Sequence, residues 1–160
     1  MEPRAVKVFL DSNVILSGLI SDRGAPRLIL DLISLGLPLL RGVTGRYNLT
    51  EIERNIAGKL PAARSVLNEG LPGMNLEIVF LPFLDEMAPF RGIVDDEDLP
   101  VLVSALIAKA DYFLTGDTNS LGQIAKHKAF GISPMDPAHF LDRVLPDILA
   151  GGKQLKGKDR

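Results

Sequence analysis

One stretch, between Asp95 and Asp117, constrains the fold more than any other part of the chain. It opens with four consecutive acidic residues, continues with an apolar run over residues 99–107, and ends in Tyr-Phe-Leu-Thr-Gly-Asp. The apolar residues recur at the spacing of one helical face, which predicts a helix directly after the acids. Tyr112-Phe113-Leu114 is typical of a short buried strand. In an open parallel sheet, the residues just past the carboxyl ends of the strands line the ligand crevice, and Asp117 would lie at such an end.

The same pattern occurs near the amino terminus. Residues 5–10 form an almost continuous apolar run that ends in Asp11-Ser12-Asn13. Parallel strands end at one edge of the sheet, so Asp11 and Asp117 are expected near each other, with Asp98 joining them if the fold brings that helix start close. Carboxylates packed together repel each other unless a cation neutralises them. Oxygen-only sites favour Mg²⁺ or Mn²⁺, so the sequence predicts a metal site.

Strand and helix patterns alternate along the rest of the chain. This predicts an α/β fold, a three-layer α/β/α sandwich with a mainly parallel central sheet. The expected strands cover residues 5–10, 37–40, 76–81, 112–114 and a short segment near 132. The expected helices cover residues 14–20, 26–36, a segment from about 44, 61–70, 99–107, 120–127 and a final segment from 136, with a loop over 82–94.

Length and composition fit one globular domain. The chain has 160 residues, of which 46% are apolar and 24% charged, so we expect one domain over residues 1–150. Residues 151–160 are expected to be a flexible basic tail. The net charge of −2 argues mildly against a broad surface for polyanions.

Other residue types narrow the chemistry. There is no cysteine, which excludes disulfides and thiolate chemistry and fits a reducing cytoplasm. His127 and His139 are the two histidines, too few for a histidine-rich zinc site, and both are expected on the surface or in helix packing. The start of the chain does not read as a signal peptide, and no run reaches membrane-spanning length, so no membrane is expected.

In their order and spacing, these motifs resemble the PIN domain family (PilT N-terminus-like, VapC-type). The matching positions are Asp11 with Asn13, Glu51 within Leu-Thr-Glu-Ile, Asp98 ahead of Leu-Val-Ser-Ala, and Thr115 with Asp117. The resemblance extends from Val6 to about Leu141. Members of this family are small metal-dependent ribonucleases, and many are the toxins of toxin–antitoxin pairs.

The resemblance implies which residues form the site. Catalysis and metal binding, with one or two Mg²⁺ or Mn²⁺ ions, would fall to Asp11, Glu51, Asp98 and Asp117. Supporting positions would be Asn13, Thr115, Asn119, Asp95 and Asp96. Glu53 is the rival of Glu51 on the same expected helix. Many relatives carry an aspartate where this chain has Asn119. The neutral amide removes one negative charge, which would lower the affinity for a second ion.

The resemblance also implies a function and partners. The substrate would be RNA, cut by a metal-activated water in the cytoplasm, and an antitoxin protein would hold the enzyme inactive. The mean hydropathy of +0.18 is consistent with a homodimer. Arg23, Arg46, Arg54 and Arg91 could hold phosphates, although a solvated arginine explains each one singly.

Two alternatives remain. The first is a non-catalytic PIN-like module that binds RNA or protein. The second is an aspartyl-phosphate phosphatase, which ranks low because the position of its usual second aspartate is occupied by Asn13 and a suitably placed lysine is missing.

Overall fold

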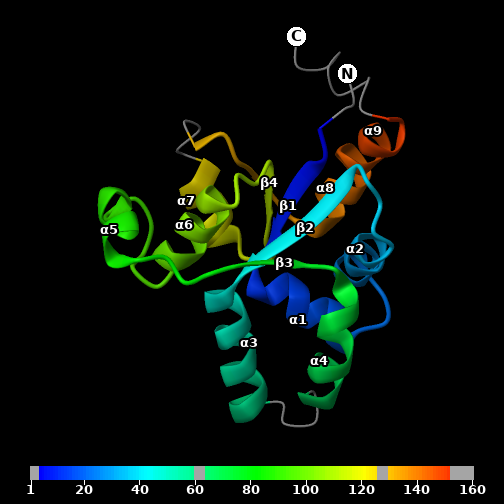
Figure 1. Ribbon diagram of the computed structural model, residues 1–160, viewed down its shortest axis with the longest axis horizontal. Coiled ribbons are helices and arrows are strands. Elements are labelled where there is room, and N and C mark those ends of the chain that lie inside the picture. The colour runs from blue at the N-terminus through cyan, green and yellow to red at the C-terminus, as the bar shows by residue number, and fades with distance from the viewer. Residues whose placement is uncertain (1–3, 60–63, 126–129, 152–160) are drawn as a thin grey trace.

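The protein is built on one parallel sheet. The computed structural model describes residues 4–59, 64–125 and 130–151. Within these ranges five strands pair in the order β3-β2-β1-β4-β5, and every neighbouring pair is parallel (Figure 1). The strands are β1 Val6–Leu10, β2 Leu40–Gly45, β3 Glu77–Val79, β4 Tyr112–Leu114 and β5 Ser133–Met135. The predicted α/β sandwich with a parallel sheet is confirmed.

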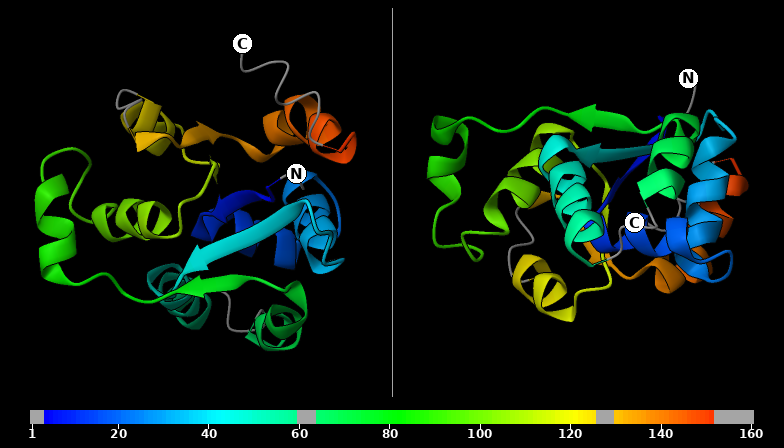
Figure 2. Two further views of the ribbon diagram at one scale, coloured as in Figure 1. Left: turned by 45° about the horizontal axis from the view of Figure 1, so that its top comes forward. Right: turned by 90° about the horizontal axis from the view of Figure 1, so that it is seen from below.

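Helices cover both faces of this sheet (Figures 1 and 2). Those before β3 are α1 Ser12–Ile20, α2 Ala25–Ser34, α3 Arg46–Lys59, α4 Arg64–Gly70 and the 3₁₀-helix η2 Leu71–Met74. Those after β3 are α5 Leu84–Met87, the 3₁₀-helix η3 Ala88–Phe90, α6 Leu99–Ile107, α7 Thr118–Ala125, α8 Pro137–Arg143 and α9 Leu145–Leu149. In the described residues, no helix has the length and apolar character that a membrane crossing requires.

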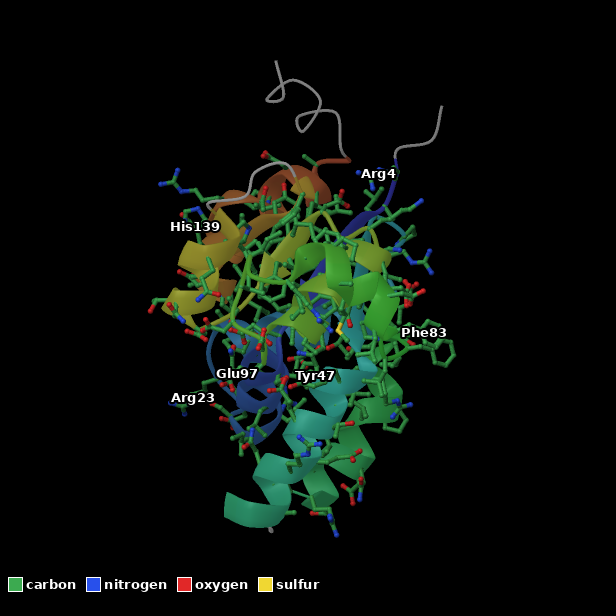
Figure 3. The ribbon with its side chains drawn as sticks, turned by 90° about the vertical axis from the view of Figure 1, so that its left-hand side faces the viewer. Arg4, Arg23, Tyr47, Phe83, Glu97 and His139 are labelled. Atoms are coloured by element: carbon green, nitrogen blue, oxygen red, sulfur yellow. The ribbon has the colours of Figure 1, made fainter. Side chains whose placement is uncertain are left out.

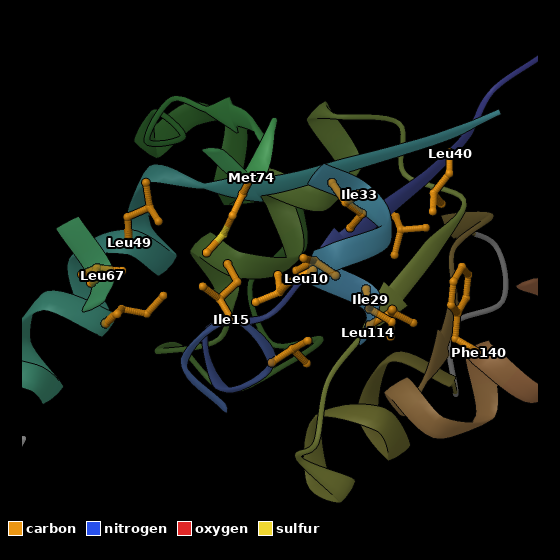
Figure 4. Packing of buried hydrophobic residues seen from close by; sticks show 14 of the residues in the cluster. Leu10, Ile15, Ile29, Ile33, Leu40, Leu49, Leu67, Met74, Leu114 and Phe140 are labelled. Atoms are coloured by element: carbon orange, nitrogen blue, oxygen red, sulfur yellow. The ribbon is translucent and has the colours of Figure 1, made fainter. Parts of the chain in front are cut away.

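The alternation of side chains along β1 divides the core into two layers. Val8 and Leu10 point into the layer that holds α1, α2 and α8, where Ile29 and Phe140 pack (Figure 4). Phe9 points into the other layer, against α6, and stacks on Phe113 with ring centroids 5.5 Å apart. Because successive strand residues face opposite sides, a strand buried on both faces is apolar throughout, as the sequence of β1 is.

The sheet order brings the two Asp-containing strand ends together. β1 is the central strand, β2 lies on one side of it and β4 on the other. The Asp11 N–H donates to the Leu114 carbonyl at 3.0 Å, so the residues that follow β1 and β4 lie at one edge. This is the switch point at which open α/β sheets place their ligands.

The second strand was predicted in the wrong place. It was expected over residues 37–40, but β2 begins at Leu40 and ends at Gly45, and α3 starts after it. Gly42 and Gly45 make this segment a poor strand by propensity. Packing explains Gly42, because a Cβ there would lie 2.7 Å from Ile33 Cδ1 and 2.9 Å from Leu76 Cδ2.

Smaller differences concern the boundaries of elements. The strand expected over 76–81 is limited to β3, and the loop expected over 82–94 contains α5 and η3. The acidic residues 95–98 form a turn before α6 rather than its first turn. The final helix is divided into α8 and α9, and Pro146 lies in the first turn of α9, where its missing N–H is not needed. Pro61, His127 and the basic tail over 152–160 lie outside the described residues.

Candidate functional site

Asp11 is held by four hydrogen bonds at the end of β1. Its Oδ1 accepts from the Ser12 N–H at 2.8 Å and from Asn48 Nδ2 at 3.2 Å. Its Oδ2 accepts from Thr115 Oγ1 at 2.7 Å and from Asn13 Nδ2 at 3.3 Å. The carboxylate also caps α1, as an aspartate at this position commonly does. Both oxygens are therefore fixed in orientation by neighbours from three separate segments.

Glu51 is joined to Asp11 through Ser12 and Asn48. Ser12 Oγ donates to Glu51 Oε1 at 3.0 Å, and Asn48 Nδ2 donates to Ser12 Oγ at 2.9 Å. Asn48 lies one helical turn before Glu51 on α3, so both side chains reach the end of β1. Glu53 is exposed. The structure thus places Glu51, and not Glu53, beside Asp11.

The loop after β4 is fastened to the start of α1. The Gly116 N–H donates to Asn13 Oδ1 at 2.8 Å, and Asn13 Nδ2 donates to Thr115 Oγ1 at 3.0 Å. Thr115 Oγ1 also accepts from the Asp117 N–H at 3.1 Å. The Asn119 N–H donates to Asp117 Oδ1 at 3.0 Å. Asn13 and Thr115 therefore orient Asp11 and shape the loop that carries Asp117.

The acidic turn before α6 supplies the fourth carboxylate. Asp98 is the N-cap residue of α6, and its N–H donates to the Asp95 carbonyl at 2.9 Å. Asp95 Oδ2 accepts from Gln123 Nε2 on α7 at 3.4 Å. Asp96 and Glu97 are exposed, and Figure 3 shows Glu97 close to Tyr47 on this face. Of the acidic run, Asp98 alone is half-buried toward Asp11.

Burial and mutual repulsion disfavour the charged forms of these carboxylates. Burial raises the pKa of Asp11, and the charge of Asp117 raises it further, against the hydrogen bonds from Thr115 and Ser12. Burial also raises the pKa of Glu51, with added repulsion from Asp11 and Asp98. The pKa of Asp98 is raised by burial and then by the charges of Asp11, Glu97 and Asp117. The four carboxylates therefore act on one another electrostatically.

The donor set suits a hard divalent cation. All four charged groups are carboxylates, and a cation between them would neutralise their mutual repulsion. As the side chains stand, no three Asp, Glu or His side chains of the described residues are arranged to hold one ion. Both oxygens of Asp11 accept two hydrogen bonds each, so the orientation of this carboxylate is fixed by the protein.

Three residues of the site were not predicted from the sequence. Ser12 and Asn48 link Asp11 to Glu51, and Asn48 is fully buried, with no hydrogen-bond partner for its Oδ1 among the described residues. Burial raises the pKa of Tyr47, and the charge of Glu51 adds to this effect. Tyr47 lies four residues before Glu51, a spacing that signals a shared helix face. No sequence signal indicates Asn48.

Removing the Asn48 amide is expected to weaken divalent ion binding. Asn48→Ala deletes the donor to both Asp11 and Ser12, so the two carboxylates lose their common support. Loss of an outer partner of a metal ligand typically costs about 10–100-fold in metal affinity. Mn²⁺ titration by calorimetry measures this change. Thr50→Ala is the control, because Thr50 lies on the same helix and its Oγ1 donates to the Arg46 carbonyl. Equal affinities in the two variants would contradict the role of Asn48.

The raised pKa of Asp98 has a consequence for stability. A carboxyl whose pKa is higher in the folded than in the unfolded state binds protons more tightly when folded, so its charge costs stability above the folded pKa. In EDTA at neutral pH, Asp98→Asn is therefore expected to melt at a higher temperature than wild type. The difference should vanish as the pH falls below about 4, the unfolded aspartate pKa. Thermal unfolding followed by circular dichroism tests this, and a lower Tm of the variant at neutral pH would contradict it.

The fold and the carboxylate arrangement define an α/β protein with an acidic site at the switch point of its sheet. Comparison with protein families matches residues 7–119 to the PIN domain. This match spans more than half of the chain, and the chain belongs to the PIN domain family. The aspartyl phosphatase alternative is not retained, because that chemistry belongs to another family.

Two solved structures share this fold. VapBC-1 from nontypeable Haemophilus influenzae is similar over 83% of this chain and 99% of its own, with a TM-score of 0.56 and 16% identity. VapBC2 from Rickettsia felis, bound to a DNA fragment from its promoter, is similar over 82% of this chain and 98% of its own, with a TM-score of 0.55 and 15% identity. At these identities the likeness concerns the fold. No curated protein matches the sequence.

Proposed function

We propose that residues 1–150 act as one nuclease domain that cleaves RNA with Mg²⁺ or Mn²⁺ held by Asp11, Glu51, Asp98 and Asp117. The observation that supports the proposal is the group of carboxylates formed by Asp11 and Asp117, at the ends of β1 and β4, with Glu51 from α3 and Asp98 at the start of α6. Membership of the PIN domain family supports the same reading.

The residues of the site would have different roles in phosphodiester hydrolysis. A bound divalent ion supplies positive charge to the scissile phosphate and makes a water molecule more acidic. A carboxylate of the site would take a proton from the water, whose oxygen bonds to phosphorus while the bond to the leaving ribose oxygen breaks and that oxygen takes up a proton from solvent. Thr115, Asn13 and Asn48 keep the Asp11 carboxylate in one orientation during this step.

Among the described residues, Arg54 is a cation near the site that could contact an RNA phosphate. It is exposed on α3, one turn after Glu51, and its charge acts on both Glu51 and Tyr47. Phosphate contacts from arginine position a nucleic acid without reading its sequence. RNA as the substrate comes from the family resemblance, and the cytoplasm is the proposed place of this activity.

An antitoxin is the proposed protein partner. Both similar structures are VapBC complexes, and an acidic edge of this kind offers a surface that a basic segment of an inhibitor can cover. The proposed role is therefore the toxin of a toxin–antitoxin pair.

The experiment that tests the function is cleavage of a labelled RNA of mixed sequence. Pure wild-type protein is incubated with Mn²⁺, with Mg²⁺ or with EDTA, and the products are resolved by length. Cutting that requires the ion is the expected result. DNA of the same sequence is the control substrate. Faster cleavage of DNA than of RNA would contradict the proposal that RNA is the substrate.

Asn119 favours one alternative. With a neutral amide in place of an acidic residue, the site carries one charge less than many relatives, which suits a module that binds RNA or protein without cutting. Folded wild type that binds the labelled RNA but leaves it intact with either ion would support this alternative over the nuclease.

A further inference from the structure

Tyr47 is an aromatic residue at the acidic edge of the sheet, and the proposed steps of hydrolysis assign it no role. It lies in the first turn of α3, directly after β2. The strand register aligns Phe9 of β1 with Val43 of β2. Two residues further on, Asp11 and Gly45 are therefore level with each other, on strands that lie about 4.8 Å apart. Tyr47 thus follows β2 at the point where Asp11 follows β1.

The side chains of Tyr47, Glu51 and Arg54 share one face of α3. Their spacing of four and then three residues places them along the same side of the helix, over a length of about 10 Å. Glu51 Oε1 accepts from Ser12 Oγ at 3.0 Å beside Asp11, and Arg54 is exposed. This face of α3 therefore carries an aromatic ring, a carboxylate of the site and a cation in succession.

Part of the Tyr47 side chain is packed and part is exposed. Tyr47 is half-buried and packs against the core layer of α6. The start of α3 lies close to α6, since a Cβ on Gly45 would approach Ser104 Oγ to 3.0 Å. Within the described ranges no second aromatic ring pairs with Tyr47, whereas Phe9 and Phe113 of the same layer stack on each other. The exposed part of the ring can therefore stack with a planar group from outside the chain.

The Tyr47 hydroxyl lies close to the charged groups of the site. Burial raises its pKa, and the charge of Glu51 raises this pKa further. Glu97 and Asp98 act in the same direction, and Arg54 acts in the opposite direction. Figure 3 shows Tyr47 and Glu97 on the same face of the molecule. A group that rests on the ring therefore lies beside the carboxylates that would hold the ion.

We propose that Tyr47 binds a base of single-stranded RNA by stacking, while Arg54 contacts a phosphate of the same strand. This inference rests on the proposed function, because it gives the substrate of that function a place along α3. Unpaired bases stack on aromatic side chains, whereas each base of a duplex is already stacked between its neighbours. Every base has a π-face, so the contact fixes the position of the strand without selecting its sequence.

Binding of a short, fluorescein-labelled single-stranded RNA tests the role of the ring. Anisotropy is measured with Ca²⁺, a hard cation that carboxylates bind, and electrophoresis verifies that the RNA stays intact. Tyr47→Leu keeps an apolar side chain against the α6 layer and removes the ring, so it is expected to bind about 10-fold more weakly or worse. Tyr47→Phe keeps the ring and is expected to bind within about 3-fold of wild type. Circular dichroism establishes that each variant is folded.

The absence of tryptophan from the sequence provides a second test. Tyr47→Trp places a single fluorescent ring at the proposed position, and a base stacked on this ring should quench its emission. Leu35→Trp is the matched control, because Leu35 is 68% exposed at the end of α2, ahead of β2 and therefore at the opposite edge of the sheet. Its emission should not change. A duplex of the same sequence should leave the emission of both variants unchanged.

These measurements separate the stacking contact from the proposed nuclease activity. Wild-type affinity of Tyr47→Leu, or equal quenching of Tyr47→Trp by single-stranded and duplex RNA, would overturn the inference even if wild type cuts RNA. Weaker binding by Tyr47→Leu, with quenching only by the single strand, would support the inference even if wild type leaves RNA intact with Mn²⁺ or Mg²⁺. In that case the protein would be a module that binds RNA without cutting it.

Discussion

Asp98→Asn is expected to cut RNA at least about 100-fold more slowly than wild type in the presence of Mn²⁺. The charges of Asp11 and Asp117 act on the Asp98 carboxylate. The substitution removes the charge of this side chain and keeps its size. The amide binds a divalent ion more weakly than a carboxylate does, so less charge is available for the scissile phosphate. The measurement is the initial rate of cleavage at saturating Mn²⁺, together with the Mn²⁺ dependence of that rate.

The matched control is Asp96→Asn, in the same acidic turn. Asp96 is exposed, and its loss should leave the cleavage rate within a few-fold of wild type. The same comparison applies on α3, where Glu51→Gln should abolish the proposed cleavage and Glu53→Gln, at an exposed position, should not. Cleavage by Asp98→Asn at the wild-type rate would remove Asp98 from the site, and equal losses in both aspartate variants would indicate a general effect of charge.

Gly42→Val is expected to destabilise the fold by about 3 kcal/mol, the upper part of the range for an overpacked core. Gly42 lies in the buried part of β2, where a Cβ would approach Ile33 Cδ1 to 2.7 Å, Ile33 Cγ2 to 2.8 Å and Leu76 Cδ2 to 2.9 Å. Neighbours on both sides of the position must move to admit a side chain. Thermal or urea unfolding measures the loss, which corresponds to a fall in Tm of roughly 6–12 °C for a chain of this size.

Gly58→Ala is the contrasting substitution. Gly58 lies in α3 with no atom within 4 Å of a Cβ built there, so alanine should stabilise the protein by about 0.5–1 kcal/mol through its helix propensity. Opposite signs for the two glycine substitutions are the expected result. A neutral Gly42→Val would show that α2 and Leu76 can move away from β2 at little cost.

The main features of the fold followed from the sequence because β1 and β4 are buried on both faces. Such strands read as continuous apolar runs, and their ends are marked by Asp11 and by Thr115-Gly116-Asp117. The error over β2 has the opposite cause. Gly42 and Gly45 are needed because a Cβ there would clash with the side chains of Ile33 and Asn48, which come from other elements. Contacts between separate elements produce no periodic pattern in the sequence.

The acidic members of the site were also predictable, whereas the residues that connect them were not. Carboxylates at strand ends stand out in a sequence, and the family pattern selected Glu51. Asn48 donates to Asp11 across 37 positions, and Ser12 donates to Glu51 across 39. A buried asparagine in a helix looks like any other polar residue in the sequence. The roles assigned to all of these residues stay predictions until the variants are measured.

The central position of β1 has a consequence for how the protein is made. During synthesis, β1 cannot pair with β4 until β4 has been made. Asp11 and Asp117 can therefore come together only after 106 further residues have been added. At roughly 5–20 residues per second, that delay lasts about 5–20 s. A half-made chain therefore holds its acidic residues apart, and the proposed site can form only once synthesis of the sheet is nearly finished.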